Sequence, residues 1–137
     1  MKLLSCLLLI LTFVFLVYIK AENPPELVLR PDNPMVTFAP GESIMKDILI
    51  LNKGGKNLKI TEVKPSCFCA SVIVHNADIR PMGKGMITLS VNTDRMEEDS
   101  LLTIDFVLKS NAKEPEHTFT LSLHNKKFIK DTLSNPH

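Results

Sequence analysis

The 137-residue chain is long enough for one domain and a leader. Its 16 Lys and Arg residues balance 15 Asp and Glu residues, which excludes the basic footprint of a nucleic-acid-binding protein. The 45% hydrophobic content resembles that of a membrane protein, but the apolar residues gather in the first 21 positions. We therefore expect a near-neutral domain behind an apolar leader, with no nucleic-acid partner.

Residues 1–21 have the pattern of an export signal. Lys2 precedes an apolar run over residues 3–19, and Lys20 and the small Ala21 follow it. The run is at the lower limit of the roughly 17–25 residues that span a membrane. This favours a signal peptide cleaved after Ala21 over an uncleaved anchor, which would hold residues 3–19 in the inner membrane. The membrane is a partner only in the second case, and in both cases the rest of the chain is exported.

Residues 22–124 are predicted to form one all-β domain. Short runs rich in Ile, Val, Leu, Thr and Phe alternate with clusters of Pro and Gly, and no run has a helical period. Apolar and polar residues alternate over 86–92, 102–109 and 117–124, so each run has one buried face. Weaker strands are expected at 27–30, 35–38 and 71–75. The pattern predicts an antiparallel β-sandwich of seven or eight strands.

The alternation also predicts which side chains face the core. They are Ile48, Ile50, Ile60, Ile87, Leu89, Val91, Ile104, Phe106, Leu108, Phe119, Leu121 and Leu123. Residues 48–51 are apolar at every position, which indicates a central strand covered on both sides or an outer patch for a partner. Residues 125–137 are polar and are expected to form a loose tail.

The run Asn52–Cys69 resembles an exported bacterial family known as domain of unknown function 1573. The family shows an Asn-x-Gly turn, a Leu-x-Ile strand and a Pro-Ser-Cys-x-Cys motif, and all three are present in this run. Ile79–Gly83 and Val91–Thr93 match its later turn and strand end in the same order. The similarity covers residues 27–124. It implies an immunoglobulin-like (Ig-like) sandwich related to the ASPM–SPD-2–Hydin type, in the periplasm or cell envelope of a bacterium, and no known activity.

The chain departs from the family pattern at three informative positions. Phe68 replaces the usual Gly between the cysteines, and Ala70 replaces the usual Thr. Met82 interrupts the usual Pro-Gly pair. Because glycine adopts turn conformations most readily, Phe68 makes a bridge between the flanking cysteines harder to form.

Cys67 and Cys69 are the only thiols of the exported part and the only place where chemistry is expected. In an extended strand their Cα atoms would lie about 6.5–7 Å apart, at the upper limit for a disulfide, so a bridge needs a local turn. Pro65 is expected to end the preceding strand near Lys64 and so allow that turn. We expect Phe68 to point away from both cysteines, toward the apolar layer.

Four interpretations of the cysteine pair remain open. Two free thiols packed as small hydrophobic groups are favoured. The others are a disulfide, a Cu(I) or Zn(II) site, and thiol–disulfide exchange. The pair is a candidate site only, and we predict no catalytic residue, no resident metal and no cofactor.

The sequence therefore predicts a non-enzymatic cell-envelope Ig-like domain. Its role is structural or protein-binding, and its partner is another envelope protein, since exported sandwiches often pair their edge strands with partners. The alternatives are a copper- or zinc-handling protein that uses Cys67 and Cys69, or a small thiol–disulfide redox domain.

Overall fold

A computed structural model describes residues 2–94, 96 and 101–128. One helix, α1 (Lys2–Glu22), precedes nine strands in the described residues. The strands are β1 (Leu27–Arg30), β2 (Met35–Phe38), β3 (Ser43–Asn52), β4 (Leu58–Pro65), β5 (Ala70–Val74), β6 (Asp78–Ile79), β7 (Lys84–Asn92), β8 (Leu101–Ser110) and β9 (Glu116–Asn125).

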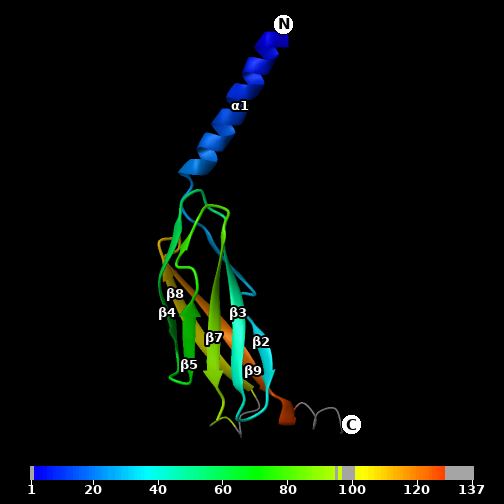
Figure 1. The fold of residues 1–137 in the computed structure, drawn as a ribbon, viewed down its shortest axis with the longest axis vertical. Coiled ribbons are helices and arrows are strands. Elements are labelled where there is room, and N and C mark those ends of the chain that lie inside the picture. Colours follow the sequence, from blue (N-terminus) through cyan, green and yellow to red (C-terminus); the bar gives the residue numbers. More distant parts are fainter. Residues whose placement is uncertain (1, 95, 97–100, 129–137) are drawn as a thin grey trace.

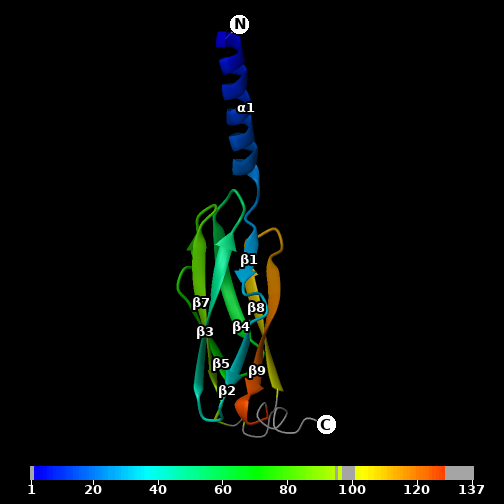
Figure 2. The same ribbon diagram turned by 90° about the vertical axis from the view of Figure 1, so that its right-hand side faces the viewer.

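The strands form two sheets that pack face to face (Figures 1 and 2). The first sheet has the order β1-β3-β7-β5, and the second has the order β2-β9-β8-β4-β6. All neighbours are antiparallel except β2 and β9, which run parallel. The chain is therefore the all-β, Ig-like sandwich that the sequence predicts. The extra strand is β6, whose two residues are too few to show an alternation.

The predicted core is confirmed residue by residue. All the side chains that the alternation assigns to the core are buried in one cluster between the sheets. Phe106 and Phe119 are direct cross-strand partners, with ring centroids 5.3 Å apart. The alternation sets this register, because a slip of one residue in either strand would turn the ring of that strand to solvent.

The segment 48–51 lies in β3, between β1 and β7. Ile48 and Ile50 are buried in the core, while Leu49 and Leu51 are half-buried on the outer face of the first sheet. Of the two sequence-based alternatives, the described residues agree with an outer apolar patch, since no further layer covers this face.

Helix α1 extends from one end of the sandwich (Figures 1 and 2). It covers the predicted leader, and none of its residues belongs to the core cluster. Within the described residues, no helix meets the length and hydropathy required to cross a membrane. Cleavage of the leader stays a prediction.

The predicted tail begins later than expected. Asn125 is fully buried at the end of β9, where it pairs with Phe38 of β2, and residues 126–128 form a helical turn. The parallel pairing with β2, which the alternation along each strand does not reveal, keeps β9 regular as far as Asn125. The remaining predicted tail, 129–137, lies outside the described residues.

A buried asparagine joins three segments at the end of the sandwich next to α1. Asn52 is 1% exposed, and its side chain bonds to backbone groups on the segment before β1, the β3–β4 turn and the β6–β7 turn. Its Oδ1 accepts from the N–H groups of Glu26 and Gly54, and its Nδ2 donates to the carbonyl groups of Lys56, Ile79 and Arg80. This explains the asparagine of the Asn-x-Gly motif as a buried structural tie.

A buried threonine has the same role at the opposite end. Thr93, which follows β7, is 0% exposed, and its hydroxyl donates to the carbonyl oxygen of Glu42 at 2.6 Å. The preceding residue, Asn92, donates its backbone N–H to the carbonyl of Cys69 at 2.9 Å. The end of β7 thus positions both the β2–β3 turn and the cysteine pair.

Candidate functional site: the Ser66–Cys69 turn

The cysteine pair lies in the turn that carries the chain from one sheet to the other. β4 of the second sheet ends at Pro65, and β5 of the first sheet begins at Ala70. The turn lies at the end of the sandwich away from α1 (Figure 1). The proline position thus predicts the end of β4 to within one residue of Lys64.

Both ends of the turn are fixed by backbone hydrogen bonds, each to a different sheet. The N–H of Ser66 donates to the carbonyl of Asp105 at 2.8 Å, and the N–H of Asp105 donates back to Ser66 Oγ at 3.1 Å. At the other end, Cys69 accepts the N–H of Asn92. The turn therefore has a defined backbone position relative to both sheets.

Cys67 and Cys69 form a disulfide in the structure. Their Cα atoms are 5.3 Å apart, inside the usual range for a bridge, because the chain turns instead of running extended. The N–H of Ala70 donates to the carbonyl of Cys67 at 3.3 Å, which closes the turn. Both cysteines are half-buried and pack against the core, as the favoured interpretation requires, but they are bonded to each other and are not free thiols.

Phe68 occupies the opposite position from the one predicted. Its relative accessibility is 112%, so the ring lies fully in solvent and does not reach the apolar layer. The prediction extrapolated strand alternation through a segment that is a turn. Because the turn directs both sulfur atoms toward the core side, the residue between them is displayed outward.

The metal interpretation gains no further ligands from the fold. Among the described residues, no group of three or more His, Cys, Asp or Glu side chains is placed to hold a metal ion. Two thiolates at Cys67 and Cys69 would become available only after reduction of the bridge. Metal binding and thiol–disulfide exchange at this pair therefore stay predictions.

A second polar cluster, which the sequence does not reveal, lies on the outer face of the first sheet. Thr88 of β7 is 6% exposed, and its hydroxyl donates to Asp47 Oδ1 of β3 at 2.6 Å. Nε2 of His75, just after β5, lies 2.8 Å from the same hydroxyl. Because the hydroxyl proton goes to Asp47, the imidazole is the donor to Thr88, the reverse of a hydroxyl nucleophile activated by histidine. The cluster ties three strands together.

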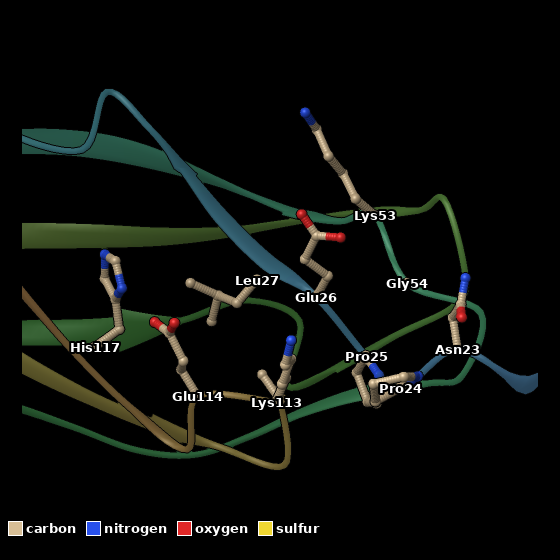
Figure 3. Close-up of a pocket in the computed structure, with 11 residues that line it drawn as sticks. Asn23, Pro24, Pro25, Glu26, Leu27, Lys53, Gly54, Lys113, Glu114 and His117 are labelled. Carbon is tan, nitrogen blue, oxygen red and sulfur yellow. The ribbon is translucent and has the colours of Figure 1, made fainter.

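A pocket lies at the other end of the sandwich, where the chain leaves α1 (Figure 3). Its volume is about 670 Å³, and it contains none of the sequence-predicted site residues. Two acids and two lysines line it, so their formal charges cancel. They are Glu26, Lys53, Lys113 and Glu114.

Two surface carboxylates have lowered pKa values. The backbone N–H of Ala39 and the charge of Lys126 lower the pKa of Glu42. Hydrogen bonds from Lys64 and Lys109 lower the pKa of Glu62, which lies 2.6 Å and 3.3 Å from their ammonium groups. Both side chains are thus held in the ionised form, which suits surface ion pairs.

Comparison with solved structures shows the same fold at low sequence identity. A protein of unknown function from Porphyromonas gingivalis W83 has a TM-score of 0.63 and 16% identity, over 76% of this chain and 48% of that protein. The secreted serine protease VesC from Vibrio cholerae has a TM-score of 0.54 and 12% identity, over 89% of this chain and 28% of VesC. SSP-19, an MSP-domain protein-like family member in Caenorhabditis elegans, has a TM-score of 0.52 and 12% identity, over 72% of this chain and 97% of SSP-19.

These similarities support the fold alone, and the chain spans about half of the Porphyromonas protein. A search of curated protein sequences found no match. A family model matches residues 34–124, which include the strands from β2 to most of β9, the buried ties and the cysteine turn. The prediction from the Asn-x-Gly and Pro-Ser-Cys-x-Cys motifs is therefore confirmed: the chain belongs to the family described as protein of unknown function DUF1573.

Proposed function

We propose that the chain is a non-enzymatic, exported Ig-like domain that binds another protein of the bacterial cell envelope through the Ser66–Cys69 turn. The observation that carries the proposal is the full exposure of Phe68. Burying an aromatic side chain of this size is worth about 1.5–3 kcal/mol, and the isolated domain forgoes that energy. A partner that encloses the ring would recover it.

The local structure supports this role because the turn is held in place before binding. The disulfide that joins the two neighbours of Phe68 restricts the backbone, and so do the hydrogen bonds of Ser66 and Cys69. Binding would then order only the two side-chain torsions of one ring, which lowers the entropic cost of association. Aromatic residues are enriched at protein interfaces for the same reason.

Two features support the proposed location. The apolar leader has the composition of an export signal. The Cys67–Cys69 disulfide suits an oxidising compartment, since such bonds are rarely stable in a reducing cytoplasm.

Site-specific photo-crosslinking in living cells tests the proposal. A photoreactive phenylalanine analogue at position 68 of the full chain should give a discrete adduct with one envelope protein, identified by mass spectrometry. The matched control places the analogue at Met82, which is 68% exposed but lies in a turn at the other end of the sandwich. The same adducts from both positions, or none from position 68, would contradict a binding role for this turn.

A further inference from the structure

The two sheets have four edges, and one of them lacks the features that block strand pairing. β1 ends with Arg30 and is followed by Pro31, and β2 lies between Pro34 and Pro40. β6 has only two residues, one of which is Asp78. Charges, prolines and short length are the usual protections of an edge strand, because they prevent another strand from adding to it. These three edges are protected in this way.

The fourth edge is β5, which has none of these protections. It pairs with β7 on one side, and its other side has no partner strand among the described residues. Residues 65–77 contain no Asp, Glu, Lys or Arg, although 23% of the chain is charged. Ile73 is 51% exposed and Val74 is 37% exposed, and both belong to this strand. β5 is thus an apolar, uncharged edge whose backbone hydrogen-bonding groups are available.

The sequence of β5 is complementary to itself in the antiparallel direction. If two copies pair about Val72, Ile73 of one copy lies opposite Ser71 of the other, and Val74 lies opposite Ala70. Ile73 and Val74 then each face a small side chain, Val72 faces its own copy, and no like charges are opposed. Such a contact is isologous, so it closes as a dimer and does not propagate.

We propose that two copies of this chain dimerise by antiparallel pairing of their β5 strands, with Val72 at the two-fold axis. The two first sheets then form one continuous sheet of eight strands, and the unprotected edges disappear. Figure 1 shows β5 along the side of the sandwich, so α1 at the end does not obstruct this edge. The dimer displays two Phe68 turns, but its formation does not depend on the protein-binding role proposed for them.

Charge substitutions at Ile73 test the pairing directly. In the proposed register the two Ile73 residues are diagonal neighbours, about 7–8 Å apart and within reach of long side chains. Ile73→Lys alone and Ile73→Glu alone should each place like charges together and weaken the dimer at least tenfold. An equimolar mixture should restore it as a heterodimer. The measurement is sedimentation equilibrium of the full chain in a non-ionic detergent.

Met45→Lys is the matched control. Met45 is 66% exposed and shares the outer face of the first sheet, but it lies on β3, opposite Ser90 of β7 and away from the β5 edge. This variant should dimerise like the wild type. A monomeric wild type at every concentration, or two Ile73 variants that dimerise as well as the wild type, would overturn the proposal.

Amide hydrogen exchange of the wild-type chain gives a second measurement that needs no variant. Protection of the β5 amides should rise with protein concentration, while protection in β3 and β8 should not. Unchanged protection of β5 would also overturn the proposal. The two proposals can be tested independently. Phe68→Ala should leave the dimer intact, and Ile73→Lys should leave the crosslink at position 68 intact.

Discussion

The side-chain oxygen of Asn52 accepts a hydrogen bond from the backbone N–H of Gly54 at 3.0 Å. Gly54 is buried beneath the segment that leads from α1 to β1, and a Cβ atom there would collide with the backbone of Pro24, Pro25 and Glu26. The asparagine therefore holds the turn, and the glycine leaves room for the chain above it. The Asn-x-Gly motif therefore has a structural role: the asparagine bonds to the turn, and the glycine allows the close contact with the segment before β1.

Replacing Asn52 by Ala should destabilise the domain strongly. Five backbone groups lose their side-chain partner. The Arg80 carbonyl keeps the N–H of Gly83, and each other group left unpaired costs about 1–3 kcal/mol, with partial relaxation reducing the sum. We expect a loss of about 3 kcal/mol or more in the free energy of unfolding. Urea denaturation followed by circular dichroism measures it.

Asn57→Ala provides the control for this prediction. Asn57 is exposed, and its side chain donates one hydrogen bond, to Asp78 at 2.9 Å. Its loss should change the free energy of unfolding by less than about 1 kcal/mol. Equal effects at positions 52 and 57 would show that the buried network around Asn52 is not a structural tie.

Replacing Met82 by Gly should stabilise the domain. Met82 has a φ of +58°, in the left-handed region, within a turn closed by the bond from Gly83 N–H to the carbonyl of Arg80 at 2.9 Å. Met82 is the residue that separates Pro81 from Gly83 in this turn. A side chain in this conformation costs about 1–2 kcal/mol, part of which the entropy of the unfolded glycine offsets.

We therefore expect Met82→Gly to raise the free energy of unfolding by about 0.5–1 kcal/mol. Met45→Gly is the matched control, because Met45 is similarly exposed but lies in a regular strand, where glycine is unfavourable. It should destabilise the domain. A destabilising effect at both positions would mean that the turn does not require a left-handed residue at Met82.

The sequence-based predictions are accurate where the signal lies within one strand, and they fail or are missing where it depends on a turn or on residues far apart in the sequence. Alternation in β7, β8 and β9 assigns the core, because one buried face repeats every second residue. The same rule fails at Phe68, since it holds only for extended chain. The Asp47–Thr88–His75 cluster comes from residues separated by 41 and 13 positions, and only the pairing of β3 with β7 and of β5 with β7 brings them together.

The two phenylalanines Phe106 and Phe68 should respond oppositely to truncation. Phe106 is fully buried and stacks on Phe119, so Phe106→Ala should leave a cavity and cost about 3–5 kcal/mol of unfolding free energy. Phe68 makes no core contact, so Phe68→Ala should change stability by less than about 0.5 kcal/mol. Thermal denaturation of both variants checks this. A large loss at position 68 would show that the ring packs against the domain in solution.

Cys67 and Cys69 should be bonded to each other in the purified domain. Intact mass spectrometry after alkylation without reductant should find Cys67 and Cys69 unmodified, and reduction should expose two more thiols. In chains that keep the leader, Cys6 is free and exposed and should be alkylated under both conditions. Two alkylated thiols in the unreduced domain, or a stoichiometric metal lost when both cysteines are replaced, would contradict the disulfide.

The same pair has a measurable effect on stability. A bridge that closes a loop of three residues restricts the unfolded chain only modestly, so replacing Cys67 and Cys69 by Ser should cost about 1.5 kcal/mol. Cys6→Ser is the control and should have no effect, because Cys6 lies in α1, outside the core. If the double variant also loses the crosslink at position 68 while it stays folded, the bridge fixes the orientation of Phe68. A crosslink that persists in the folded double variant would show that the hydrogen bonds of Ser66 and Cys69 suffice to present the ring.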